Sequence, residues 1–132
     1  GASSKNMAYP LPDKRVLTIP AEVRMKIPEL LFQPALNGKE CHSIQDLCWT
    51  SISDSDIDVR KELSKNIILS GGTTMYEGIA DRLKNEVTKL AATGMEVRII
   101  ASADRKFAVW KGASTLASLS TFETSWISAA DY

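Results

Sequence analysis

The residues best suited to chemistry in this chain form a loop after an apolar run: Gly71 and Gly72, followed by Thr73 and Thr74. Glycine-rich loops of this kind can cradle a phosphate group with backbone N–H groups. A Walker loop requires a lysine after its last glycine, and the threonines occupy that place. A dinucleotide-binding loop requires the spacing G-x-G-x-x-G, which the stretch GGTTMYEG lacks. Neither common phosphate signature is therefore present.

The residue types of this loop still permit contact with a ligand. The two glycines let the backbone pass close to a bound molecule, because no Cβ stands in the way. We expect the two threonines to cap the following helix and to leave its first N–H groups as a weakly positive end. Met75 and Tyr76 suit packing on a base or on a partner protein. Two interpretations stay open, a ligand-contacting loop and a structural turn, and the spacing alone favours the turn.

A metal site is the other chemistry to consider, since Cys41, His42 and Cys48 lie close together in the sequence. The cysteines are a heptad apart, about 10 Å along a helix, which is too far for a disulfide. A zinc site needs a further cysteine or a well-placed histidine, and His42 is the only histidine. We therefore interpret both cysteines as reduced thiols of an intracellular protein.

The composition is that of an ordinary globular domain. The 132 residues are 44% hydrophobic, and 16 basic residues balance 16 acidic ones. This balance provides no field that would attract nucleic acid or an anionic membrane. No apolar run approaches the roughly 18 residues that span a bilayer. The start, GASSKNMAYP, lacks the apolar segment of a secretory signal, and we expect residues 1–8 to be a disordered lead that begins with a cloning remnant, Gly1 to Ser4.

Sequence patterns in the first half predict a strand followed by helices. Residues 14–20 alternate as a half-buried strand does, after a hairpin turn at residues 12–14. Pro28 is expected to open a short helix. Ser43 and Asp46 form a capping-box-like start for another helix. We expect its apolar face to hold Ile44, Leu47, Cys48 and Ile52.

The second half follows the order strand, helix, strand, helix, which favours an α/β arrangement. A helix is expected over residues 56–63 and strands over residues 66–70 and 95–102. Further helices are expected to start near Phe107 or Val109 and at Ser120 or Thr121. The helix after the glycine loop should be about four turns long and packed on a sheet. Its predicted apolar stripe consists of Ile79, Leu83, Val87 and Leu90.

Several long stretches resemble actin in order and spacing. The stretch LSGGTTMYEGIADRLKNEV is similar to the actin segment whose glycine loop lies against the nucleotide. DVRKELSKNIILSGG, LFQPALNGKE and RIIASADRKFAVWKGASTLASLSTFETSWISAADY also resemble actin, and YPLPDKRVLTIPAEVRMKIPELLF matches more loosely. The resemblance covers nearly everything after Ala8. It indicates the C-terminal third of an actin or of a divergent actin-like protein.

The resemblance implies a fragment of the actin-like ATPase (ribonuclease H-like) fold, an α/β mixed sheet with flanking helices. Residues 9–132 would form the C-terminal portion, mostly the nucleotide-cleft subdomain of the second lobe, ending in helices of the first lobe. Actin-family proteins bind ATP or ADP with magnesium and hydrolyse ATP slowly. Their phosphate loops and catalytic residues lie in earlier parts of the family sequence. We therefore expect the isolated chain to bind no cofactor detectably and to release no phosphate from ATP.

The resemblance also assigns residues to the nucleotide. Lys106 would sit over the base. The adenosine and diphosphate side of the cleft would be lined by Gly71, Gly72, Thr73, Met75 and Tyr76. These residues would supply half of a nucleotide pocket, with no catalytic group and no metal ligand among them.

A second loop, with Leu36, Asn37, Gly38 and Lys39, is similar to the actin loop whose apolar tip inserts between filament strands. Leu36 keeps one apolar contact, whereas Asn37 and Lys39 are polar where actin is apolar. Burying an apolar side chain contributes about 1.5–3 kcal/mol, and burying an unpaired lysine costs free energy. We therefore expect a weaker contact between strands and short or unstable filaments.

The stretch VWKGASTLASLSTFETSW is similar to the edge of the cleft through which actin binds regulators. Leu116 and Leu119 keep its apolar character. Lys111, Thr115 and Ser125 stand where actin has larger apolar residues. Two interpretations stay open, a narrower patch for partner helices and solvent-facing substitutions without consequence.

Two functions follow from the resemblance. The first is an actin-family cytoskeletal ATP-binding protein of the cytoplasm, whose partners are other actin-family subunits and actin-binding proteins. The alternative is a non-filament actin-related scaffold subunit of a larger complex, which the loop departures favour modestly. A sugar kinase or chaperone of the same ATPase fold would not share SLSTFETSWIS. A compact non-native dimer is the alternative form of the isolated chain, because exposed sheet edges tend to pair.

Overall fold

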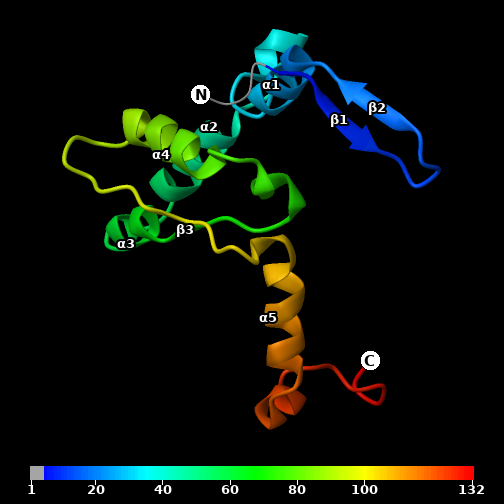
Figure 1. The fold of residues 1–132 in the computed structure, drawn as a ribbon. Helices are drawn as coiled ribbons and strands as arrows, with labels where there is room; N and C mark the ends of the chain where they lie inside the picture. Colours follow the sequence, from blue (N-terminus) through cyan, green and yellow to red (C-terminus); the bar gives the residue numbers. More distant parts are fainter. Residues whose placement is uncertain (1–4) are drawn as a thin grey trace.

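The computed structural model describes residues 5–132, which fold into short helices and strands joined by turns (Figure 1). The α-helices are α1 (Ala21–Glu29), α2 (Ile44–Ser53), α3 (Arg60–Lys65), α4 (Ile79–Leu90) and α5 (Ala108–Ala117). The strands are β1 (Met7–Pro10), β2 (Val16–Ile19), β3 (Ile67–Ile68) and β4 (Ile99–Ile100). Four 3-10 helices complete the described elements: η1 (Pro34–Asn37), η2 (Gly72–Met75), η3 (Arg105–Phe107) and η4 (Ser120–Thr124).

The strands form two small sheets, which confirms mixed α/β content. β1 and β2 are antiparallel, with Met7 opposite Ile19 and Pro10 opposite Val16. β3 and β4 are parallel, with Ile67 opposite Ile99. The described strands thus pair two by two, in place of the single mixed sheet that we expected.

The β1–β2 hairpin projects from the body of the molecule (Figure 1). Its turn is the predicted one, closed by the bond from the Leu11 N–H to the Arg15 carbonyl (2.8 Å). The prediction of a half-buried strand was wrong, since Val16 and Leu17 are exposed and only Ile19 is half-buried. A hairpin with no layer packed against it cannot bury either face.

The lead that we expected over residues 1–8 extends only partly into the described structure. Residues 1–4 lie outside the described residues. Met7 and Ala8 form the first half of β1 and pair with Ile19 and Thr18. The first strand therefore includes the last two residues of the expected lead.

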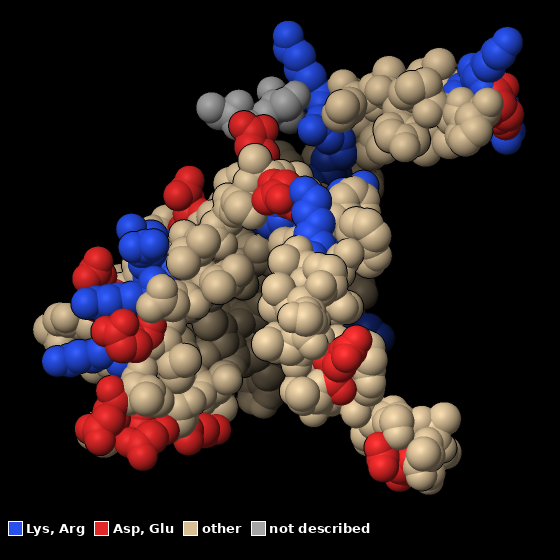
Figure 2. Space-filling model, turned by 90° about the horizontal axis from the view of Figure 1, so that it is seen from below, with Lys and Arg blue, Asp and Glu red and all other residues tan. Residues whose placement is uncertain are grey.

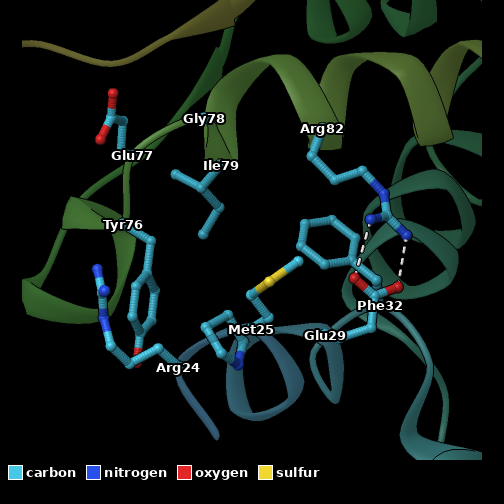
Figure 3. A pocket seen from close by; sticks show the side chains of 10 residues that line it. Arg24, Met25, Glu29, Phe32, Tyr76, Glu77, Gly78, Ile79 and Arg82 are labelled. Carbon is cyan, nitrogen blue, oxygen red and sulfur yellow. Dashed lines mark hydrogen bonds and ion pairs between the residues drawn. The ribbon is translucent and has the colours of Figure 1, made fainter. Parts of the chain in front are cut away.

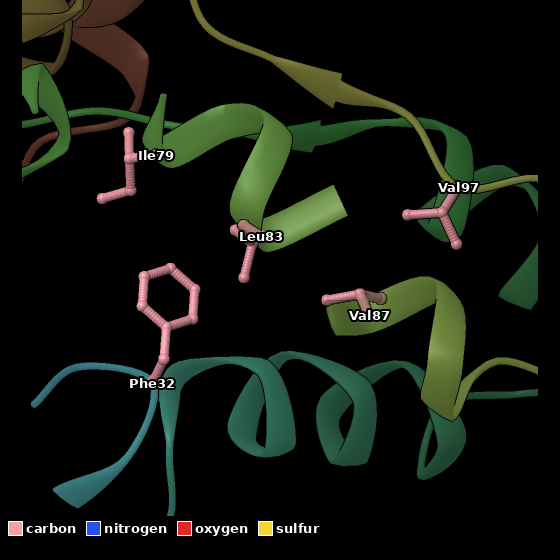
Figure 4. Packing of buried hydrophobic residues seen from close by; sticks show 5 residues of the cluster. All are labelled: Phe32, Ile79, Leu83, Val87 and Val97. Atoms are coloured by element: carbon pink, nitrogen blue, oxygen red, sulfur yellow. The ribbon is translucent and has the colours of Figure 1, made fainter. Parts of the chain in front are cut away.

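The core is built on one face of α4 (Figure 4). The side chains of Ile79, Leu83 and Val87 are buried there, as the predicted stripe requires, and Val87 has no exposed surface. Leu90, the last residue of the stripe, is 40% exposed because the helix ends there. Phe32 lies near Ile79 and Leu83 toward one end of this row, and Val97 lies near Val87 toward the other end.

α2 contributes the second layer of this core. Its predicted capping box is confirmed: the Ser43 Oγ accepts from the Asp46 N–H, and the Asp46 carboxylate accepts from the Ser43 N–H. Cys48 packs against the α4 cluster. The predicted apolar face is right for Ile52, which is buried, and wrong for Leu47, which is mostly exposed.

Two predicted helix starts differ from the structure. Pro28 does not open a helix but lies near the end of α1, which begins at Ala21 directly after Pro20. A proline fits the first turn of a helix, and Pro20 provides a closer start signal than Pro28 does. α3 begins at Arg60, later than the predicted residue 56, because residues 57–59 form a turn first.

A charged contact joins α1 to α4. Arg82 donates from Nη1 and Nη2 to the two carboxylate oxygens of Glu29, at 2.9 and 2.7 Å. Its guanidinium also lies over the Phe32 ring, 4.8 Å from the ring centroid. These hydrogen bonds from Arg82 lower the pKa of Glu29. The fork geometry fixes the direction of α1 relative to α4, because both partners are planar.

α5 extends away from the body and carries the C-terminal end of the chain on its far side (Figure 1). None of its residues is buried, and Trp110 is 71% exposed. The chain exposes 10315 Å², about one and a half times the roughly 6,900 Å² of a compact protein of this size. None of the helices in residues 5–132 is long and apolar enough to cross a membrane.

Replacing Leu83 with alanine should lower the free energy of unfolding by about 2–5 kcal/mol, because a 4% exposed leucine leaves a cavity in the core. The matched control is Leu90→Ala in the same helix, which should cost less than about 1 kcal/mol. Urea unfolding followed by circular dichroism measures both changes. Equal losses would contradict the assignment of the core to the α4 face.

Glu29→Gln should flatten the pH dependence of stability in acid. The folded-state pKa of Glu29 lies below its value of about 4.3 in an unfolded chain. The pair therefore stabilises the fold above about pH 4.3, and this contribution is lost as the pH falls through the lowered pKa. Urea unfolding between pH 3 and pH 6 measures it. Glu62→Gln in α3 is the control, and a profile for Glu29→Gln that ran parallel to wild type would contradict the expectation.

Candidate functional site

The glycine loop follows β3 and folds into η2. Gly71 has a φ of 90°, a backbone conformation that residues other than glycine rarely adopt. The Thr74 Oγ1 donates to the Gly71 carbonyl at 2.7 Å, and the Thr74 N–H donates to the same carbonyl at 3.1 Å. The loop is thus held in one tight turn.

The prediction that the two threonines cap the next helix was wrong. Thr73 and Thr74 lie inside η2, and α4 begins only after Gly78, which has a left-handed conformation and offers no side-chain cap. The reason is that the Thr74 hydroxyl donates to the Gly71 carbonyl within the loop, five residues before α4 starts. The loop therefore presents no capped helix end to a ligand.

A second segment, η3, lies directly beside η2. The Gly71 N–H donates to the Arg105 carbonyl at 2.9 Å. The Arg105 guanidinium in turn donates to the Thr74 carbonyl from Nε at 3.0 Å and from Nη2 at 2.8 Å. Lys106, the residue after Arg105, is therefore held near the glycine loop although about 30 residues separate the two in sequence.

The two segments meet because β3 and β4 are parallel. η2 follows the carboxyl end of β3 and η3 follows the carboxyl end of β4. The Leu69 N–H donates to the Ile100 carbonyl at 2.9 Å, which continues the pairing toward the loops. Ligands of open α/β sheets commonly bind outside the carboxyl ends of parallel strands. The geometry at this edge is thus suited to a ligand.

The side chains at this edge are available to a ligand. Met75 and Tyr76 are 40% and 44% exposed. The Lys106 Nζ lies 5.1 Å from the centroid of the Phe107 ring and is exposed to solvent. A planar apolar group and a nearby cation could both be offered to a base here.

A cavity of about 370 Å³ lies between α1 and α4, and Tyr76 is one of the residues that line it (Figure 3). Its walls carry Arg24 and Met25 from α1 and Ile79 from α4, with the Arg82–Glu29 pair at one end. The sequence did not predict this cavity, because its two walls are about 50 residues apart.

No metal centre is formed by the described part of the chain. Residues 5–132 contain no group of three or more histidine, cysteine, aspartate or glutamate side chains placed to hold an ion. Cys41 and Cys48 are free thiols, as predicted. Burial raises the pKa of Cys48, which makes it a weak nucleophile at neutral pH.

The family model for actin matches residues 1–132 of the chain. The chain belongs to the actin family.

In this actin-family chain the loop similar to the filament loop forms η1 and the turn after it. Leu36 is 64% exposed, and Gly38 adopts a left-handed conformation that ends the 3-10 helix. Asn37 and Lys39 are exposed as well. All of the residues that the resemblance assigns to this loop are therefore at the surface, away from any core cluster.

The residues that the resemblance assigns to the partner cleft lie on α5 and just beyond it, and all are exposed: Lys111, Thr115, Leu116, Leu119 and Ser125. The Lys111 Nζ is 2.9 Å from an Asp104 carboxylate oxygen, which lowers the pKa of Asp104. In Figure 2 charges of both signs alternate over one side of the actin-family chain, and much of the remaining face is uncharged. α5 carries a single charge, that of Lys111.

Gly71→Ala should destabilise the actin-family chain by about 1–3 kcal/mol, because alanine is strained at a φ of 90°. The matched control is Gly72→Ala. Gly72 has no positive φ, and a Cβ there would meet nothing within 4 Å, so its cost should be below about 0.5 kcal/mol. Urea unfolding of the two variants compares them. A larger loss for Gly72→Ala would show that the loop adopts another conformation.

Proposed function

We propose that this chain forms the adenosine-side wall of the nucleotide cleft of an actin-family cytoskeletal protein. The observation that carries the proposal is the meeting of η2 and η3 at the carboxyl ends of β3 and β4. This arrangement supports a ligand site built from two segments distant in sequence. Family membership supports a nucleotide as the ligand.

The proposed roles follow from the side chains at this edge. The backbone of Gly72 and Thr73 would approach the ribose and diphosphate, since the glycine has no side chain to obstruct it. Met75 and Tyr76 would pack on the base with their exposed apolar surfaces. Lys106 would place its ammonium over the base from η3. Together these groups can bind and orient adenosine.

The bound group would be ATP or ADP with magnesium in a longer actin-family protein. These residues fit adenosine, since they offer aromatic and thioether surface and a cation. The proposal gives them no role in holding the magnesium or in activating water. Residues 9–132 would be the C-terminal portion of the actin-like fold, with β3 and β4 inside a ribonuclease H-like sheet and α5 in helices of the other lobe.

Partners are proposed on the same basis. Membership of the actin family suggests other actin-family subunits as partners. The large exposed area of the chain and the surface of α5, whose only charged residue is Lys111, are consistent with an actin-binding protein or a second subunit covering this helix. We propose a cytoplasmic, cytoskeletal location, which rests on family membership alone.

A scaffold role in a larger complex is the second candidate function. It is favoured by the polar surface of the η1 loop, where Asn37 and Lys39 would have to be buried in a filament contact. The Lys111–Asp104 ion pair places two charged groups at the proposed partner face. Both features would weaken filament contacts. Neither would change the residues proposed to bind the nucleotide.

Tyr76→Ala in the longer protein should weaken ATP binding about tenfold, since stacking of a base on an aromatic ring contributes roughly 1–3 kcal/mol. Lys106→Ala should weaken it by a smaller factor. The matched control is Tyr9→Ala on the β1–β2 hairpin, another half-exposed tyrosine, which should leave the affinity unchanged. Isothermal titration calorimetry measures the three dissociation constants. An unchanged affinity in Tyr76→Ala would overturn the proposed wall.

A further inference from the structure

Arg105 lies at the junction of η2 and η3 and forms hydrogen bonds there with both its side chain and its backbone. Its guanidinium donates to two backbone carbonyls: to Thr74 from Nε and Nη2, at 3.0 and 2.8 Å, and to Ser102 from Nη1, at 2.9 Å. Its own carbonyl accepts from the Gly71 N–H at 2.9 Å. The sequence alone predicts no role for Arg105, in contrast to Lys106 next to it.

These bonds hold both ends of the glycine loop. The Gly71 N–H lies at the start of η2, and the Thr74 carbonyl lies near its end. Each end is tied to Arg105, one through its backbone and the other through its side chain. The loop can therefore move relative to η3 only if these bonds break.

The geometry of the fork explains why an arginine stands here. Two N–H groups of one planar guanidinium converge on the single Thr74 carbonyl, and a third reaches the Ser102 carbonyl on the opposite side. A lysine ammonium is a point charge on a flexible stem and cannot hold two backbone segments in one plane. The two bonds to the Thr74 carbonyl are partly buried, which shields them from solvent and strengthens them, whereas the bond to the Ser102 carbonyl is exposed.

We infer that Arg105 is a positioning residue that fixes the distance between the two halves of the adenosine wall, which are Met75 and Tyr76 at the end of η2 and Lys106 on η3. This inference rests on the proposed function for its ligand. Arg105 itself does not touch the nucleotide. It acts through the Thr74 carbonyl, which precedes Met75, and through the backbone that carries Lys106.

The experiment compares Arg105→Met and Arg105→Lys with Arg60→Met. Arg60 is a matched control because it is also half-buried and also donates to a backbone carbonyl, that of Ser55 at 2.9 Å, in α3. Amide hydrogen exchange is measured on this chain, and the ATP dissociation constant is measured by calorimetry on the longer protein. Thermal unfolding of each variant records the global stability.

In Arg105→Met we expect the Gly71 and Thr74 amides to exchange at least tenfold faster, and ATP binding to weaken about tenfold. Arg105→Lys should give an intermediate loss in both, because it keeps the charge but not the fork. Arg60→Met should lower the melting temperature about as much as Arg105→Met does. It should nevertheless leave ATP binding and the amide exchange of the glycine loop unchanged. If ATP affinity and amide protection fell in proportion to the melting temperature in the Arg105 and Arg60 variants alike, the positioning role would be overturned.

Failure of the proposed function gives a different result. If the longer protein bound no ATP, or if Tyr76→Ala bound it normally, the adenosine wall would be wrong whatever Arg105 does. If Tyr76→Ala weakened ATP binding and Arg105→Met did not, the proposed adenosine wall would be supported and the positioning role of Arg105 would be wrong. Unchanged loop exchange in Arg105→Met would also overturn the inference, independently of any nucleotide.

Discussion

The burial of one face of α4 is the constraint on which the rest of the described structure depends. Ile79, Leu83 and Val87 cover α2 on one side, and Val97 joins them from the segment that leads into β4. This packing sets where β4 runs and therefore where it pairs with β3. The placement of η2 and η3 side by side is a consequence, because each follows the carboxyl end of its strand. The proposed site thus depends on a core that contains none of its residues.

The sequence was sufficient for elements with strong local signals. The stripe of α4 is periodic and the capping box of α2 is chemically specific. The capping box was predicted correctly, and the stripe was predicted correctly except for Leu90, which is exposed at the helix end. The periodicity of apolar residues predicted burial incorrectly where burial depends on whether another layer of the structure covers the element. The alternation of β2 predicts a buried face, but no layer covers the hairpin, and Leu47 faces solvent although it fits the helical period.

The site was predicted in part for the same reason. The glycine loop has a local signature, so its turn could be expected from Gly71 and Gly72. The hydroxyl of Thr74 was assigned to the wrong partner, because a helix cap and a bond to the Gly71 carbonyl use the same residue type. The role inferred for Arg105 could not be predicted, since it arises from contacts between segments about 30 residues apart. The cavity beside Tyr76 was missed because its walls lie still farther apart in sequence.

The central claim is that a base lies between Tyr76 and Lys106. Photolabelling of the longer protein with 8-azido-ATP, followed by peptide mapping, tests it most directly, because the azide reports the position of the base itself. The account predicts a label on Met75, Tyr76 or Lys106 that excess ATP prevents. Labelling that ATP prevents but that maps away from both η2 and η3, for example to Trp110 or Leu116 on α5, would contradict it.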